Sequence, residues 1–122
     1  MNRRTRKRLG CGEFDYLGFS IKSKLNTSSM DYDPDKFMND LIDLCEANDL
    51  GIGGSQNAEG MHYFIEKWVM RGWKSSKRRR FVRKHASEKD MNLIKNYLDQ
   101  FGFISDLKVG PLYSCMNYNW ED

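Results

Sequence analysis

The chain has 122 residues, of which 39% are hydrophobic and 30% are charged. This length suits one domain, and the composition fills a core beneath a heavily charged surface, which excludes a chain that is disordered throughout. No apolar run approaches the roughly 18 to 20 residues that cross a bilayer, and the basic start lacks the apolar stretch of a signal peptide. We therefore expect one cytoplasmic domain over 1–122 that has no membrane partner.

The net charge of +3 is distributed unevenly along the chain. Positions 1–9 hold five cations and no acid, and positions 69–86 hold eight cations and no acid. The rest of the chain holds 7 cations and all 17 acids, a net charge of −10. Blocks of like charge repel one another and stay extended until a partner neutralises them. The sequence therefore predicts an acidic body with two basic segments, and a polyanion as the partner.

The first segment, residues 1–12, is expected to form a flexible basic arm. Over 14–25 polar and apolar residues alternate with the period of a half-buried strand, and the apolar parity holds Leu17, Phe19, Ile21 and Leu25. A polar turn follows. Asp33 and Pro34 then supply an N-cap and a first helical residue, which begin an amphipathic helix that ends near Asn48.

A hairpin is expected next, with a short strand at Leu50 and Ile52, a turn over 53–57 and a second strand over 61–68. The glycines of the turn lack the lysine and the following helix that a phosphate-binding loop requires, so a tight turn with positive φ explains them better. The second basic segment, 69–86, follows this hairpin.

A second helix is predicted to begin at Ser87, which forms a capping box with Asp90, and to end at Gly102. A last strand over 107–109 is expected to break at Gly110-Pro111, and the aromatic tail 113–122 carries no assignable pattern. The order strand, helix, strand, strand, helix, strand is typical of the α+β class. It predicts a ferredoxin-like (split βαβ) two-layer sandwich with two helices on a four-stranded antiparallel sheet.

An ordered set of residues resembles the YggL family, small bacterial proteins that bind the large (50S) ribosomal subunit. Its pieces are Arg6-Lys7-Arg8-Leu9, Glu13-Phe14, Leu17-Gly18-Phe19, Phe37, Leu41-Ile42, Glu46-Ala47-Asn48 with Leu50, Gly53-Gly54, Glu59-Gly60, Val109-Gly110-Pro111-Leu112 and Trp120. The resemblance covers roughly 3–68 and 86–120. It implies a role in ribosome assembly or another ribosome-associated function, with no known catalysis. Residues 69–85 look like an insertion in this family.

Both basic segments are predicted to bind ribosomal RNA, because each cation that neutralises a phosphate releases counterions and adds affinity. Aromatic residues near the second segment favour stacking on unpaired bases. The residues expected to bind RNA are Arg3, Arg4, Arg6, Lys7, Arg8, Trp73, Lys74, Lys77, Arg78, Arg79, Arg80, Arg83 and Lys84. If 69–86 forms a β-ribbon that extends the preceding strand, it becomes a second projection toward RNA.

Two other classes of function stay open at this point. One is a protein-interaction module whose basic insertion, 69–86, binds an acidic partner, and such segments also serve merely as solubilising charge. The other is an RNA-modifying or hydrolytic enzyme that uses Cys11, Cys45 or His62, although no local signature of a nucleophile supports it. Three scattered cysteines and two histidines without metal spacing predict free thiols, no metal and no cofactor. A non-enzymatic factor that binds the large ribosomal subunit is the main prediction.

Overall fold

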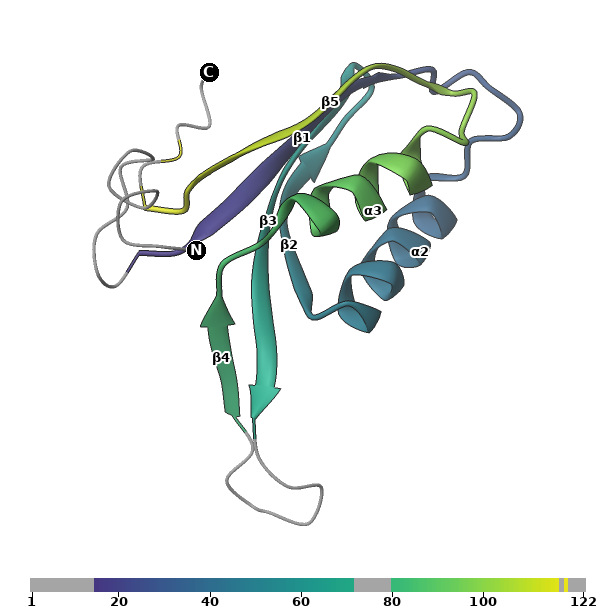
Figure 1. Ribbon diagram of the computed structural model, residues 1–122. Helices are drawn as coiled ribbons and strands as arrows, with labels where there is room; N and C mark the ends of the chain where they lie inside the picture. The colour runs from purple at the N-terminus through teal and green to yellow at the C-terminus, as the bar shows by residue number, and fades with distance from the viewer. Residues whose placement is uncertain (1–14, 72–79, 117, 119–122) are drawn as a thin grey trace.

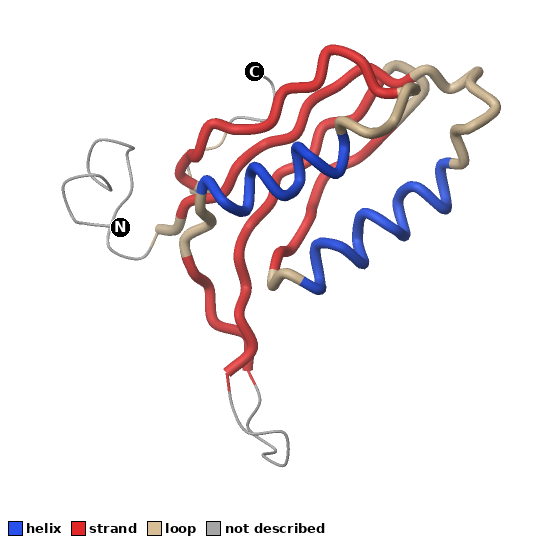
Figure 2. Tube along the Cα trace, turned by 45° about the vertical axis from the view of Figure 1, so that its right-hand side comes forward, coloured by secondary structure: helices blue, strands red, loops and turns tan. Residues whose placement is uncertain are grey.

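The computed structural model describes residues 15–71, 80–116 and 118. In chain order its elements are β1 (Leu17–Leu25), α2 (Pro34–Ala47), β2 (Leu50–Gln56), β3 (Gly60–Arg71), β4 (Arg80–Lys84), α3 (Glu88–Leu98) and β5 (Ile104–Ser114). Both helices lie on one face of a single antiparallel sheet (Figures 1 and 2). The predicted α+β class is confirmed.

The sheet has five strands, so the prediction of four is wrong. Four of them follow the order β2-β3-β1-β5, and β4 pairs with β3 off this path. The extra strand arises because β3 continues to Arg71, and the pairing of 67–71 with 80–84 satisfies backbone groups that the extension would otherwise leave unpaired. The finer ferredoxin-like assignment stays a prediction.

The β3–β4 hairpin projects beyond the body of the sheet, at the bottom of Figure 1. At its base, β4 ends where β1 begins: the Ala86 N–H donates to the Leu17 carbonyl at 2.9 Å, and the Leu17 N–H donates to Nδ1 of His85 at 3.0 Å. The hypothesis of a β-ribbon that extends the preceding strand is therefore confirmed for the described part of 69–86.

The core lies between the sheet and the two helices. The predicted apolar parity of β1 is confirmed, because Leu17, Phe19 and Ile21 are fully buried and Leu25 nearly so. Three of these four residues pack in one cluster with the inner faces of both helices, which contribute Phe37, Leu41, Cys45, Ile94 and Leu98. On β3 the core positions are Met61, Tyr63 and Ile65, so the alternate residues of that strand point to the other face of the sheet.

Both predicted helix N-caps are confirmed. The Asp33 carboxylate accepts the N–H groups of Asp35 and Lys36 at 3.1 and 3.2 Å, with Pro34 at the first helical position. At α3 the capping box is complete, since the Asp90 N–H donates to the Ser87 hydroxyl at 3.3 Å and the Ser87 N–H donates to the Asp90 carboxylate at 2.9 Å.

Three predicted boundaries are wrong for identifiable reasons. Helix α3 ends at Leu98 and not at Gly102, because Phe101 leaves the helix to stack on Phe103, with ring centroids 5.1 Å apart. Strand β2 passes through the glycines to Gln56. The turn lies beyond it, where the Asn57 carboxamide accepts two backbone N–H groups.

The last strand is also longer than predicted. Strand β5 continues through the cis Gly110-Pro111 bond to Ser114. It is an edge strand of the described sheet, and a proline without an N–H is tolerated where no neighbouring strand accepts one.

Asp90 joins α3 to the sheet, and its removal is expected to destabilise the fold. It is buried at 6% exposure and accepts from Nζ of Lys67 on β3 at 3.0 Å, in addition to closing the capping box. We expect Asp90→Ala to lower the free energy of unfolding by about 2–3 kcal/mol, since the cap and a charged hydrogen bond are lost together. Glu88→Ala, an exposed acid in the same turn, is expected to cost about 0.5 kcal/mol. Urea denaturation measures both, and equal losses would contradict the role of Asp90.

Candidate functional site

The face of the sheet opposite α2 and α3, here called the open face, carries the candidate site. Strand β3 contributes four side chains to this face, in alternation with its core positions: His62, Phe64, Glu66 and Trp68. No described helix covers it (Figure 2). Strand register therefore decides which side chains meet there.

One row across the open face is cationic. The register places His62 of β3 opposite Lys22 of β1, and Lys22 opposite Lys108 of β5. We call Lys22, His62 and Lys108 the cationic row. Burial, followed by the charge of Lys22, lowers the pKa of His62.

Aromatic rings occupy the next part of the open face. The Phe64 ring lies over Gly18, where an added Cβ would be 2.6 Å from its Cε1 atom. The Tyr118 ring lies against Phe64 with centroids 4.3 Å apart, and its hydroxyl is hydrogen-bonded to the His62 ring. Trp68 lies over Gly51, where an added Cβ would be 3.2 Å from the indole. The glycines let these rings lie flat along the sheet.

A pocket of about 330 Å³ opens among these rings. Its lining includes Phe64, Trp68 and Tyr118, together with the Glu66 carboxylate and two glycines of β2, Gly51 and Gly53. A Cβ built at Gly53 would meet nothing within 4 Å, so the space beside this residue is empty. We call this the aromatic pocket. It offers flat apolar surfaces and one carboxylate, which suits a flat polar ring better than a compact ion.

Glu66 also connects the pocket to the base of the hairpin. One of its oxygens accepts from the Trp68 indole N–H at 3.1 Å, and the other forms an ion pair with Arg83 at 3.2 Å. The Arg83 guanidinium lies 5.3 Å from the ring centroids of both Trp68 and Tyr16, within the range of cation–π attraction. This network fixes β4 against the open face.

Only part of the predicted RNA-binding set lies among the described residues. Arg83 is held in the network at the hairpin base, Lys84 is exposed at the end of β4, and Arg80 begins that strand. The other predicted residues lie outside the described residues: Arg3, Arg4, Arg6, Lys7, Arg8, Trp73, Lys74, Lys77, Arg78 and Arg79. The basic arm 1–12 lies outside them as well.

Sequence reasoning missed the cationic row and the aromatic pocket. Lys22 occupies one of the polar positions in the alternation of β1. Its alignment with Lys108 depends on the pairing of β1 with β5, which joins residues 86 positions apart in the sequence. Tyr118 lies in a tail with no periodic pattern. The sequence signals for these residues were the polar positions of Lys22 and Lys108 in their strands and the aromatic character of 61–68.

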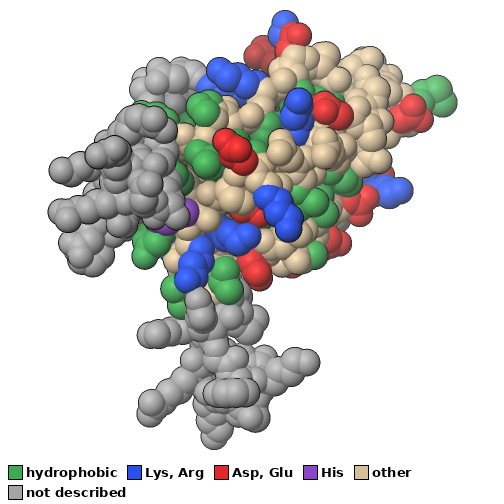
Figure 3. All heavy atoms as spheres, viewed as in Figure 1, with side chains coloured by type: hydrophobic (Ala, Val, Ile, Leu, Met, Phe, Trp, Pro, Cys, Tyr) green, Lys and Arg blue, Asp and Glu red, His purple; other side chains and the backbone are tan. Residues whose placement is uncertain are grey.

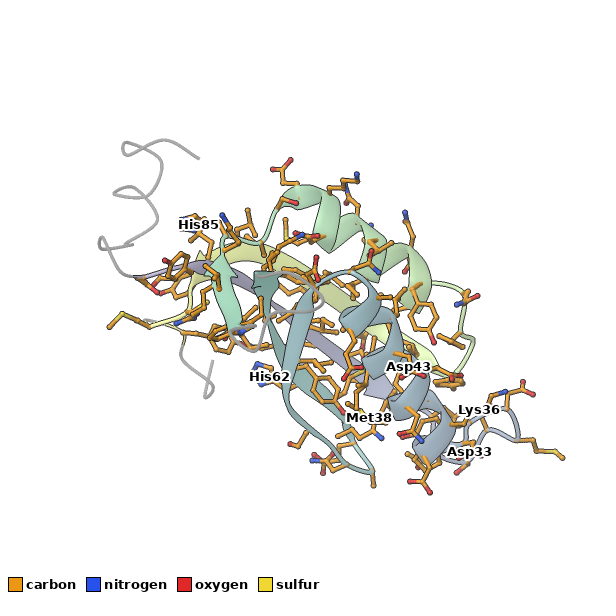
Figure 4. The ribbon with its side chains drawn as sticks, turned by 90° about the horizontal axis from the view of Figure 1, so that it is seen from below. Asp33, Lys36, Met38, Asp43, His62 and His85 are labelled. Atoms are coloured by element: carbon orange, nitrogen blue, oxygen red, sulfur yellow. The ribbon has the colours of Figure 1, made fainter. Side chains whose placement is uncertain are left out.

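The candidates for nucleophilic catalysis do not converge. Cys45 is fully buried on the inner face of α2, whereas His62 is on the open face, and Cys11 lies outside the described residues. Burial, followed by the charge of Glu46, raises the pKa of Cys45 to about 12. A thiol with this pKa stays protonated at neutral pH and is a weak nucleophile. The two histidines also lie apart (Figure 4).

In the described part of the chain, no group of three or more histidine, cysteine, aspartate or glutamate side chains is placed to hold a metal ion. Neither of the two helices combines the length and apolar character needed to cross a bilayer.

The fold and its open face define a small α+β protein, and comparison with known families gives its affiliation. Residues 3–118 match the family described as YggL 50S ribosome-binding protein. The chain belongs to this family, which confirms the resemblance seen in the sequence. The family is one of ribosome-binding proteins and not a known enzyme family. No curated protein and no solved structure matches the chain.

The buried thiol makes stability depend on pH in a defined direction. Because the folded chain holds the pKa of Cys45 at about 12 against an ordinary 9.0, the unfolded chain releases this proton first as pH rises. The contribution of Cys45 to the free energy of unfolding is therefore nearly constant below about pH 9 and falls between pH 9 and 12, by about 1 kcal/mol at pH 10. Urea denaturation at pH 8 and pH 10 measures the change. Cys45→Ala should show a smaller drop between these two pH values, and an equal drop would contradict the assignment.

Proposed function

We propose that this protein binds the large ribosomal subunit by placing its open face and its two basic segments against ribosomal RNA. It acts without catalysis in the bacterial cytoplasm, in the assembly of the subunit. The observation that carries the proposal is the separation of charge along the chain, between the acidic region around α2 and the two basic segments. Family membership supports the partner, and the charges support the face that meets it.

The helix layer is strongly acidic. Positions 31–49, which contain α2 and its flanks, hold seven acids and one cation, Lys36. Figure 3 shows acidic side chains spread among Lys and Arg side chains over the side that carries the helices, and Figure 4 places Asp33 and Lys36 together at the start of α2. RNA phosphates are repelled by such a surface. The helix layer is therefore the side expected to face away from RNA.

The hairpin and the arm concentrate the positive charge. The hairpin segment 69–86 holds eight cations and the start of the chain five, and neither holds an acid. In this proposal β1, α2, β2, β3, α3 and β5 form the ferredoxin-like unit, and β4, which holds Arg80, Arg83 and Lys84, is an addition to it. Each cation that neutralises a phosphate adds salt-sensitive affinity. The proposed contacts are Arg3, Arg4, Arg6, Lys7, Arg8, Trp73, Lys74, Lys77, Arg78, Arg79, Arg80, Arg83 and Lys84.

A matched pair of triple variants tests the hairpin. Arg78→Ala, Arg79→Ala and Arg80→Ala together remove three cations from the hairpin segment, while Lys36→Ala, Lys89→Ala and Lys95→Ala remove three exposed cations from the two helices. We expect the hairpin variant to co-sediment less with large subunits and to lower the slope of log affinity against log salt by about 2–3. The helix variant should bind like the wild type. Equal losses would show that net charge alone drives binding.

The arm is tested in the same assay. Replacing Arg3, Arg4, Arg6, Lys7 and Arg8 with alanine removes five cations, so we expect binding to large subunits to weaken at 100 mM salt and to become less sensitive to added salt. Wild-type binding by this variant would remove the arm from the proposal while leaving the hairpin in it.

Nuclease treatment separates RNA binding from the alternative of an acidic protein partner. The native complex is isolated from cells that express the full chain, digested with ribonuclease and resolved by size. We expect the complex to dissociate, because phosphates supply the attraction. A complex that survives complete digestion of its RNA would favour a protein-interaction module.

A further inference from the structure

Strand β2 is a free edge of the described sheet. It stands at one end of the order β2-β3-β1-β5, so no described strand pairs with its outer side. The Trp68 N–H donates to the Asp49 carbonyl at 2.7 Å, and hydrogen-bonded pairs with β3 then recur at every second residue. The N–H and C=O groups of Leu50 and Ile52 therefore point outward. They offer donors and acceptors to a further strand.

Strand β2 also lacks the features that protect an edge. Natural edge strands carry charged residues or proline, which oppose pairing with another chain. Strand β5, at the other end of the order, has both, in Asp106, Lys108 and Pro111. The sequence of β2, LGIGGSQ, includes no charged residue and no proline. Pairing with a further strand is therefore open on β2 and opposed on β5.

The aromatic pocket lies beside this edge. Gly51 and Gly53 of β2 line it, with Trp68 over Gly51 and empty space beside Gly53. A strand added to β2 would run about 4.8 Å from it and would place every second side chain on the open face. An aromatic side chain on a neighbouring strand stabilises a sheet by covering an edge glycine. One such side chain would enter the pocket across Gly53.

We propose that β2 binds an extended, basic polypeptide segment as an additional strand, with one tyrosine side chain in the aromatic pocket and its lysines or arginines beside α2. Backbone hydrogen bonds to Leu50 and Ile52 supply affinity, and the pocket selects the side chain, as where peptides extend other sheets. The inference goes beyond the proposed function, since it concerns a protein partner and does not depend on RNA contacts of the basic segments.

A tyrosine side chain matches the lining of the pocket. The rings of Phe64 and Trp68 supply flat apolar surfaces, and the volume of about 330 Å³ is at the small end of ligand pockets. Each oxygen of Glu66 accepts one hydrogen bond, from Trp68 or from Arg83, and has a further lone pair for a phenolic O–H. Because Arg83 neutralises Glu66, a neutral hydroxyl suits this position better than a second cation.

The charges of α2 favour a basic segment. Every second side chain of an added strand would point toward the helix layer, where α2 packs against β2 (Figure 1). Helical spacing places the exposed acids Asp35 and Glu46 on the flank of α2 opposite Asp40, which lines a hollow with Phe101, just after α3. Because α3 packs on β5, the flank with Asp35 and Glu46 is the one nearer the free edge. Its carboxylates attract lysine and arginine.

The same charges oppose a second copy of this chain as the occupant. Two β2 edges paired antiparallel about a two-fold axis would bring both α2 helices onto one face of a continuous sheet. Positions 31–49 hold seven acids and one cation in each copy, so the two helices would repel each other. A basic segment meets attraction at the same place.

Backbone pairing is tested with Ile52→Pro, which removes an outward N–H and leaves the bonds to β3 in place. Ile52→Ala is the matched control, because it loses the same side chain and keeps the N–H. The probe is a fluorescent heptapeptide in which lysines alternate with threonine, a central tyrosine and threonine. Thermal unfolding checks that the full-length variants fold. We expect Ile52→Pro to bind about tenfold more weakly than Ile52→Ala, and equal affinities would overturn the proposal.

Changes in the peptide test the pairing on the wild-type protein. One peptide carries N-methyl groups on its lysines, and a second carries them on tyrosine and threonine. We expect one set to abolish binding and the other to leave it unchanged, because only every second N–H of an added strand points toward β2. Equal effects of the two sets would contradict strand addition. A peptide with glutamates in place of the lysines should not bind, and wild-type affinity for it would exclude a basic partner.

The pocket is tested with Gly53→Val, at a position where a Cβ meets nothing within 4 Å. Gly102→Val is the control, because a Cβ there also meets nothing within 4 Å and Gly102 does not line the pocket. We expect Gly53→Val alone to weaken the tyrosine peptide about tenfold, and neither variant to change the weaker binding of a peptide with glycine at its centre. Equal weakening of both peptides would remove the pocket from the proposal.

The same variants identify the other possible occupants. We expect the wild type to sediment as a monomer, and a dimer that Ile52→Pro dissociates would assign the edge to a second copy. Binding of a single-stranded RNA heptamer that Gly53→Val weakens, without binding of the peptide, would assign the pocket to a base. Either result would overturn the proposal.

Discussion

Seven carboxylates between 31 and 49 give one side of this small protein a charge that repels phosphate, and two segments at other places in the chain carry most of its cations. Helix α2, which carries most of these carboxylates, covers one face of the sheet, and the open face and the β3–β4 hairpin are free of it. In the proposed complex, the repulsion would orient the protein as much as the attraction would supply affinity. A body of the same total charge with mixed signs would have no preferred side toward RNA.

Strand β3 connects the body of the sheet to the β3–β4 hairpin. Its first part pairs with β1 and β2, and its last part pairs with β4, so the hairpin is a continuation of the central sheet. Two ionic contacts fix this continuation on opposite faces: Lys67 with Asp90 on the helix side, and Glu66 with Arg83 on the open face. Arg83 thus stabilises the hairpin base, where its charge is partly neutralised by Glu66.

Local patterns in the sequence were enough to predict most of the fold. The apolar parity of β1 and the Asp33 and Ser87 caps depend on neighbouring residues, and the structure confirms them, whereas the predicted order of elements lacked β4. The errors lie where a local signal was overridden by pairing. Gly53 and Gly54 suggested a turn, yet β3 holds them in a strand, and Gly54 keeps a positive φ of 130° within it. Gly110-Pro111 suggested a break, yet an edge strand accommodates it.

The site was less predictable for the same reason. Charge runs are contiguous in sequence, so the arm and the hairpin were evident as candidate contacts. The cationic row and the aromatic pocket combine residues from β1, β2, β3, β5 and the tail, and they exist only once the register is known. The segregation of charge is therefore visible in the sequence, whereas the grouping of side chains on the open face is visible only in the structure.

The orientation of the protein on the ribosome is the central claim, and crosslinking from its two faces tests it directly. A photoreactive benzoylphenylalanine replaces either Ser55, exposed on the open face opposite His62, or Asp43, exposed on α2. After irradiation of the complex with large subunits, reverse transcription locates crosslinks on the ribosomal RNA. The account predicts crosslinks from position 55 at defined nucleotides and few from position 43. Crosslinks as frequent from position 43 as from position 55 would contradict it.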